Sequence, residues 1–374
     1  MNDIRRTILW VIFGFSMVLL WDKWQLHNGN KATFFPSPAA VGAAAPAAGA
    51  SAPLAGAASV PASTAPAVAS IGASAVPGTP APAAPAAREK IEVTTDVYRL
   101  TFDGEGGSLT HAELLKHADM TDKAKNFVLF DESTQRVYAA QTGLIGGSFP
   151  THKTVMTAVP GPRALKDGEN ELTIRFESPE QGGVKLVKTW TLKRGAYDIA
   201  VKHEVVNVGS TAVSPQLYLQ LVRDGNKPPG ESSFYSTFTG PAVYTDAKKY
   251  QKIEFKDIEN GKVDIPKESP NGYVAMVQHY FASAWLLADG VQRELFTRKV
   301  SDNLYSVGMI TPLGNIDPGT TKVVDARLFA GPQVETMMEK LYPGLELVKD
   351  YGWLTILSKP LYWLLDQLHK LLGN

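Results

Sequence analysis

Alternation of apolar and polar residues along most of the chain constrains its fold more than any other feature. The clearest run is 184–192 (VKLVKTWTL), which reaches a Lys193-Arg194-Gly195 turn and is followed by a second run over 197–206 (YDIAVKHEVV). A period of two is typical of strands with one buried face, and two such runs around a short turn predict a β-hairpin. Further runs of this kind cover 91–100, 171–176, 216–222, 250–255, 273–287, 294–300, 304–310 and 322–329.

Few helical segments separate these runs. Turn clusters with glycine or proline stand between several of them, and only 334–341 and the last residues of the chain have a helical pattern. Many strands with few helices between them predict antiparallel sheets folded as one large sandwich. The fold class is therefore expected to be mainly β, with the sandwich over 88–332.

The first residues predict a membrane anchor. Two arginines precede an uncharged run over 7–21 (TILWVIFGFSMVLLW), and Asp22 and Lys23 end it. No small residue follows where a signal peptidase would cleave, so an uncleaved anchor is favoured over a cleaved secretory signal or a buried soluble helix. Arginine before the run predicts a cytoplasmic N-terminus and an exported remainder. Residues 1–31 form this segment, and its expected anchoring residues are Arg5, Arg6, Ile8, Leu9, Trp10, Leu20 and Trp21.

A linker is predicted over 32–87. Residues 36–87 contain 23 Ala and 10 Pro, and no charged residue occurs between 32 and 87. Such a composition buries too little apolar area to offset the entropy of ordering, and its prolines block helix growth. We therefore expect a disordered tether between the anchor and the sandwich.

The last segment, 333–374, predicts amphipathic helices. Pro360 suits a first helical turn, after which leucines recur on one face while Asp366, His369 and Lys370 lie opposite. The helix could pack on the sandwich or lie in the membrane interface, and the tryptophans and tyrosine near it favour the interface. The expected interfacial residues are Trp353, Leu361, Leu364, Leu365, Leu368, Leu371 and Leu372.

Signals of chemistry are few. Equal numbers of basic and acidic residues, 37 each, argue against a nucleic-acid partner, and the absence of cysteine excludes thiol chemistry and disulfides. The seven histidines have no metal-ligand spacing. We therefore predict no catalytic residue, no cofactor and no metal site, and a protein that is not an enzyme. Arg223 and Asp224 are expected to form a solvated pair. A group of aromatic residues could line a sugar or peptide groove or cover a sheet edge: Phe234, Tyr235, Phe238 and Tyr244.

The layout resembles the YidC membrane protein insertase family of Gram-negative bacteria. The similar stretches are 5–10 (RRTILW), 106–109 (GGSL), 189–207 (TWTLKRGAYDIAVKHEVVN), 273–285 (YVAMVQHYFASAW), 328–332 (LFAGP) and 351–365 (YGWLTILSKPLYWLL). They follow the family's order from the anchor, through the periplasmic domain, to the passage into an interfacial helix.

The resemblance implies a periplasmic β-supersandwich in a protein of the bacterial inner membrane. It also implies nascent membrane proteins, the lipid bilayer and the Sec translocon, including SecD and SecF, as partners. The family inserts proteins through a hydrophilic groove with a buried arginine, for which these residues have no counterpart. We therefore expect them to supply the anchor, a docking or chaperone domain and the interfacial helix. A membrane-anchored periplasmic adaptor and a carbohydrate-binding β-sandwich are the alternatives.

Overall fold

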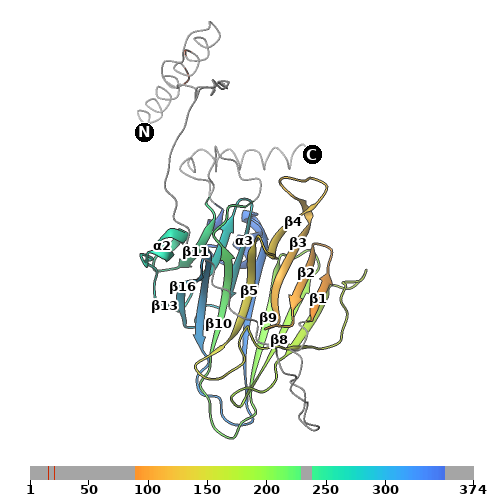
Figure 1. Ribbon diagram of the computed structural model, residues 1–374, viewed down its shortest axis with the longest axis vertical. Helices are drawn as coiled ribbons and strands as arrows, with labels where there is room; N and C mark the ends of the chain where they lie inside the picture. Colours follow the sequence, from red (N-terminus) through yellow and green to blue (C-terminus); the bar gives the residue numbers. More distant parts are fainter. Residues whose placement is uncertain (1–15, 17–20, 22–88, 229–237, 350–374) are drawn as a thin grey trace, which may run out of the picture. The chain divides into compact units, whose positions relative to one another are not determined.

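The computed structural model describes residues 89–228 and 238–349, together with Ser16 and Trp21. Between 89 and 349, the described residues form two antiparallel sheets of nine strands each (Figure 1). The antiparallel, mainly β architecture expected from the alternation is confirmed.

The first sheet has the strand order β1-β2-β3-β4-β5-β10-β17-β16-β13. In that order the strands are β1 (Lys90–Thr94), β2 (Tyr98–Asp103), β3 (Ser108–Ala118), β4 (Asn126–Glu132), β5 (Val137–Ile145), β10 (Gln216–Asp224), β17 (Leu304–Pro312), β16 (Arg293–Ser301) and β13 (Glu268–Ser269).

The second sheet has the order β12-β11-β14-β15-β18-β9-β8-β7-β6. Its strands are β12 (Lys249–Lys252), β11 (Gly240–Thr245), β14 (Tyr273–Gln278), β15 (Phe281–Leu287), β18 (Thr321–Pro332), β9 (Asp198–Asn207), β8 (Val184–Lys193), β7 (Glu171–Glu177) and β6 (Thr157–Ala158). The described helices are α2 (Phe255–Glu259), α3 (Glu335–Leu341) and the 3-10 helix η1 (Leu345–Val348).

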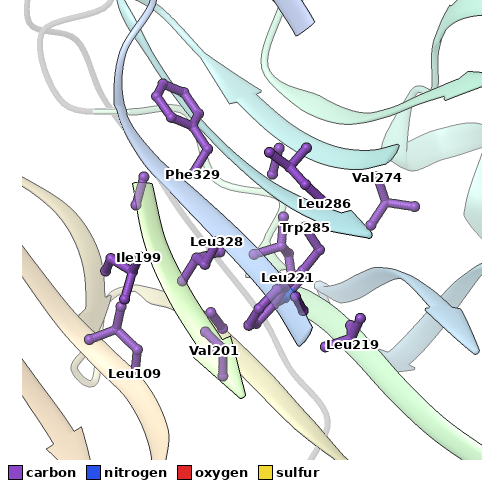
Figure 2. Packing of buried hydrophobic residues seen from close by; sticks show 14 of the residues in the cluster. Leu109, Ile199, Val201, Leu219, Leu221, Val274, Trp285, Leu286, Leu328 and Phe329 are labelled. Atoms are coloured by element: carbon purple, nitrogen blue, oxygen red, sulfur yellow. The ribbon is translucent and has the colours of Figure 1, made fainter. Parts of the chain in front are cut away.

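The two sheets pack face to face around one large core, part of which is seen in Figure 2. Trp285 on β15 is fully buried, and its indole N–H donates a 3.0 Å hydrogen bond to the carbonyl oxygen of Gln220 on β10. Beside it, the hydroxyls of Tyr138 on β5 and Ser283 on β15 lie 2.6 Å apart. Buried polar groups need hydrogen-bond partners, so these bonds fix the position of one sheet relative to the other. Apolar packing alone would allow the sheets to shift against each other.

The hairpin expected from 184–192 and 197–206 is confirmed. Strands β8 and β9 pair in antiparallel register, with Leu192 opposite Ile199 beside the turn. Alternate residues of β9 are buried, as a period of two requires.

Two long runs expected as single strands are each two strands. The run 91–100 is broken after Thr94, because the Thr95 hydroxyl accepts the backbone N–H groups of Val97 and Tyr98 and so turns the chain. The run 273–287 folds back at His279 and Tyr280, so that β14 and β15 pair with each other. Tyr280 has φ 65°, a left-handed conformation that a tyrosine rarely adopts. The turn was missed because neither of its residues is the glycine or asparagine that usually marks such a turn.

Other elements were missed or shortened. The strand expected over 250–255 ends at Lys252, and helix α2 begins at Phe255. The sequence did not single out β3, β4, β5 or β11. The second half of β3 (AELLKHA) is rich in good helix formers. It is a strand because β2 and β4 pair with it on both sides. The helix expected over 334–341 is confirmed as α3.

Candidate functional site

The predicted anchor and interfacial residues lie almost wholly outside the described residues. Of the anchor set, only Trp21 is described; it is helical and 49% exposed. The interfacial set, from Trp353 to Leu372, lies outside. Among the residues that the structure describes, no helix combines the length and the apolar character needed to cross a bilayer.

Histidines in the described part of the chain contact side chains of the domain. His203 is fully buried on β9, and its Nε2 lies 3.0 Å from the Thr142 hydroxyl. The ring of His117 lies 3.1 Å from the hydroxyl of Tyr197. Among the described residues no three His, Asp or Glu side chains gather as a metal site would require. Glu204, next to His203 in sequence, points to the other face of the strand and pairs with Arg175 at 3.0 Å.

The expectation of a solvated Arg223–Asp224 pair is wrong. Both residues end β10 and are buried, with 1% and 6% of their surfaces exposed, Arg223 on the core face and Asp224 on the opposite face. The Arg223 guanidinium lies 5.3 Å from the ring centre of Tyr138, and the Asp224 carboxylate accepts the backbone N–H groups of Val137 and Asn226. The strand continues two residues beyond the expected end, so both residues are part of the sheet before the loop begins.

Only two of the four aromatic residues in the predicted group lie in the described part of the chain. Phe234 and Tyr235 lie outside the described residues, and Phe238 packs against the core without being fully buried. Tyr244 is buried and stacks on Tyr273 at 5.3 Å between ring centres. Tyr244 is therefore part of the packed core.

A lysine is buried between the sheets. Lys188 on β8 is fully buried, and its Nζ donates to the carbonyl oxygens of Gly106 and Thr142, each at 2.6 Å. Burial lowers the pKa of Lys188 to about 7. Burial, and then the charge of Lys188, lowers the pKa of His203 to about 3. This cluster joins three segments of the sandwich but has no access to solvent, so it is structural.

A hollow on the outer face of the first sheet is the best candidate for binding. It has a volume of about 210 Å³ and crosses β5, β10, β17 and β16. Its floor is an apolar cluster separate from the main core, formed by Tyr218, Phe296 and Ile310 with Ile145 packed against them. We call this the outer hollow; its remaining lining residues are Thr151, His152, Gln220 and Arg298.

Two glycines inside strands make room for the floor. Gly143 lies opposite Tyr218, and Gly308 lies opposite Phe296. A Cβ atom at either position would collide with the facing aromatic side chain. Glycine within a strand commonly marks close approach of another group, and here it lets two aromatic rings lie on the sheet surface.

The loop after β5 closes one side of the outer hollow. The backbone N–H of His152 donates a 2.8 Å hydrogen bond to the Tyr218 hydroxyl, and Nδ1 of the same residue contacts that hydroxyl. Burial raises the pKa of Tyr218, so the hydroxyl stays protonated and donates a hydrogen bond to Nδ1. Burial, followed by Lys153 and Lys188, lowers the pKa of His152 to about 4. The neutral ring therefore carries its proton on Nε2, as a hydrogen-bond donor.

Charge is distributed unevenly along this face. On β16, the outward positions are Glu294, Phe296 and Arg298, and the guanidinium of Arg298 lies 4.6 Å from the Phe296 ring centre. A second hollow of about 260 Å³ shares Ile310 with the outer hollow. Its charged lining residues are Glu294, Glu268 and Arg293, and the Arg293 guanidinium donates to backbone carbonyl oxygens. No carboxylate lines the outer hollow. An apolar floor thus has an acidic end and a basic end, and an apolar pocket with a few polar groups is typical of ligand sites.

Sequence reasoning missed this face. Its residues come from β5 and the loop after it, β10, β16 and β17, which are separate in the sequence. The available signal was weak: aromatic residues at positions 218 and 296, and a glycine at 308 inside a predicted strand.

Comparison with known proteins gives consistent matches. The family model described as "YidC periplasmic domain" matches residues 90–364. The membrane protein insertase YidC of Janthinobacterium sp. (strain Marseille) is 48% identical over 374 residues, and that of Cupriavidus necator is 52% identical over 372. In both, the match covers 100% of this chain and 65% of the relative, so the chain spans about 65% of those proteins' length.

Solved structures are far more distant. A galactose mutarotase related enzyme from Lactobacillus acidophilus has 9% sequence identity and a TM-score of 0.41, over 65% of this chain and 97% of that one. A similarity at this level says nothing about a shared activity.

Proposed function

This chain belongs to the YidC family of membrane protein insertases, and from that membership we propose that it holds a β-sandwich at the membrane for the insertion and folding of membrane proteins. The observation that carries the proposal is the identity of about half of all residues with curated insertases over the whole chain. The protein that contains this chain assists insertion with or without the Sec translocon. The residues in hand supply the anchor, a periplasmic docking and chaperone domain, and the interfacial helix.

The proposed role is binding without covalent chemistry. The buried polar groups of the sandwich support it, because Lys188, His203, Arg223 and Arg293 contact groups of the domain itself. Arg293, for example, donates to the carbonyl oxygens of Gly272 and Ala288 at 2.7 and 2.6 Å. Charged groups used in this way fix a scaffold, which is what a docking domain needs.

The proposed topology follows from the sequence at the two ends. Arg5 and Arg6 hold the N-terminus in the cytoplasm, and residues 7–21 cross the inner membrane. The linker over 32–87 then lets the sandwich, 88–332, move in the periplasm. The leucine face from Leu361 to Leu372 lies in the outer interface of the bilayer.

Photocrosslinking in native membranes tests the partners. A benzophenone amino acid is placed at Tyr280, which is 60% exposed on the β14–β15 turn, at Val334, which is 41% exposed beside α3, and at Lys322 on β18. We expect adducts with pulse-labelled nascent membrane proteins and with SecD or SecF from at least one position. A nascent soluble cytoplasmic protein is the matched substrate control.

The pattern of adducts decides between roles. Adducts with Sec components and none with nascent chains would replace the chaperone role by that of an adaptor. No adduct of either kind, with the chain present at its normal amount, would contradict the proposal.

A further inference from the structure

The outer hollow has a size and a polarity that fit one kind of ligand. Its volume, about 210 Å³, accommodates one large apolar side chain but no folded element. Its floor of two aromatic rings and an isoleucine is suited to that side chain. A ligand held here by a single side chain needs further contacts on either side of it.

Two charged residues on β16 can provide those contacts, and the strand fixes the spacing between them. Glu294 and Arg298 lie two residues before and two residues after Phe296 on the same face of β16. At about 3.3 Å per residue, the Cα atoms of Glu294 and Arg298 are separated by about 13 Å along the strand. The Arg298 guanidinium reaches back to 4.6 Å from the Phe296 ring centre. In an extended polypeptide, residues i−2, i and i+2 also share one face and span the same length.

The two charges are available to a ligand. Within the described part of the chain, neither Glu294 nor Arg298 forms an ion pair with another side chain. Glu268 lies beside Glu294 in the second hollow and strengthens the acidic end. Of the polar groups around the outer hollow, the Tyr218 hydroxyl contacts His152 and the Gln220 amide nitrogen donates to Gln141 at 2.9 Å. The His152 ring and the Arg298 guanidinium present N–H donors.

We propose that this face of the first sheet binds an extended polypeptide segment in which an apolar side chain is flanked, two residues away on each side, by one basic and one acidic residue. The apolar side chain lies on Tyr218 and Phe296, the basic residue lies at Glu294, and the acidic residue lies at Arg298. The proposal rests on the proposed chaperone role, for which it names the site and the class of segment bound. Complementary charge sets the register, while the aromatic floor supplies most of the contact area.

The test uses the full 374-residue chain in lipid nanodiscs and acetylated, amidated peptides that contain 4-fluorophenylalanine. Fluorine NMR measures their binding. The probe has the pattern Lys-Ser-fluoroPhe-Ser-Glu, and two comparison peptides have Lys or Glu at both charged positions. We expect the mixed-charge peptide to bind about tenfold more tightly than either comparison peptide, the effect of one charge-assisted contact.

Charge reversal makes the result independent of folding defects. Arg298→Glu is expected to make the Lys-Ser-fluoroPhe-Ser-Lys peptide the tightest ligand, and Glu294→Lys is expected to favour the peptide with two Glu residues. A gain of this kind requires a folded site. Lys322→Glu, on the second sheet, is the matched control and leaves the order of the three peptides unchanged.

Equal binding of the three peptides, or an order that neither reversal alters, would overturn the proposal. Either result removes the hollow as a peptide site and leaves the insertase proposal to the crosslinking experiment. Charge-dependent binding together with an absence of nascent-chain adducts would instead leave a peptide site on an adaptor.

Discussion

The side-chain nitrogen of Lys188 lies 2.6 Å from the carbonyl oxygen of Gly106, at the turn that leads into β3. A second carbonyl, that of Thr142 on β5, lies at the same distance. One buried lysine thus joins β8 of the second sheet to two segments of the first. No carboxylate takes part in these bonds, so burial disfavours the charged form of Lys188, and the neutral amine can still donate to both carbonyl oxygens.

Stability is expected to rise with pH through the titration of Lys188. Its pKa is about 7 in the folded state and near 10.5 when unfolded, so the unfolded state binds more protons between these values. Stability therefore increases from pH 7 to pH 9, with a slope of up to about 1.4 kcal/mol per pH unit, and Lys188 adds no slope below pH 7. Urea unfolding at pH 6, 7, 8 and 9 measures it. In Lys188→Met the rise should disappear, whereas Lys185→Met, on the same strand, should retain it; a rise that persists in Lys188→Met would contradict the assignment.

His203 should make the domain sensitive to acid. Its pKa, about 3 in the folded state, lies below the ordinary value of 6.5, so the unfolded state binds the additional proton as pH falls from 6.5 toward 3. Stability is lost in that window by up to about 1.4 kcal/mol per pH unit. Unfolding measured between pH 7 and pH 4 should show a shallower slope for His203→Gln than for the unaltered chain. His111→Gln, at a half-buried position on β3, is the control, and an equal slope in both variants would count against His203.

The hydroxyl pair between the sheets should show coupling. Tyr138→Phe is expected to lower the free energy of unfolding by about 1 kcal/mol, because Ser283 loses the bond to its buried hydroxyl. Ser283→Ala should cost a similar amount, and the double variant should cost less than the sum of the two. Urea unfolding of all four proteins completes the cycle. Strict additivity would mean that the 2.6 Å contact contributes nothing to stability.

Relief of backbone strain at Tyr280 should stabilise the domain. Asparagine adopts a positive φ more readily than tyrosine, and Tyr280 has φ 65° with its side chain exposed. Tyr280→Asn is therefore expected to raise the free energy of unfolding by about 0.5–1 kcal/mol. His279→Asn, in the same turn but without a positive φ, should give no such gain. A loss of stability in Tyr280→Asn would show that the ring makes a contact that outweighs the strain.

The leucine face at the end of the chain should bind lipid. Leu364→Glu combined with Leu368→Glu places two carboxylates on the apolar face that the spacing predicts. A synthetic peptide of residues 350–374 should bind anionic liposomes in a flotation assay, and the doubly substituted peptide should stay in solution. Asp366→Glu with Lys370→Arg, on the opposite face, is the conservative control. Unchanged flotation of the doubly substituted peptide would contradict an interfacial helix.

The fold class could be predicted from the sequence because apolar and polar residues alternate with a period of two wherever a strand has one buried face. Strands buried on both faces were predicted less well: every residue of β14 and β15 is buried, and the run 273–287 was expected as one strand because the turn between them has neither glycine nor asparagine. Strand β3 was hidden by its helix-forming composition. In each case long-range pairing overrides local preference, and a single sequence contains no direct record of it.

The outer hollow was harder to predict than the fold. Tyr218, Phe296 and His152 are brought together by the order of strands in a sheet, and alternation does not reveal that order. Arg223 illustrates the same limit, since the sequence placed it at the start of a loop and the structure places it under Tyr138. The chemistry of a site depends on which strands are neighbours.

Strand β18 is the last strand among the described residues, yet it lies in the middle of its sheet, between β15 and β9. The ribosome therefore finishes β6–β9, and then β11, β12, β14 and β15, while the position that joins the two sets is vacant. Each half ends in an edge whose N–H and C=O groups have no neighbour until residues 321–332 arrive. Closure of the second sheet is thus a late event of biosynthesis, and a ribosome that stalls before residue 321 leaves two incomplete half-sheets prone to pair with other chains.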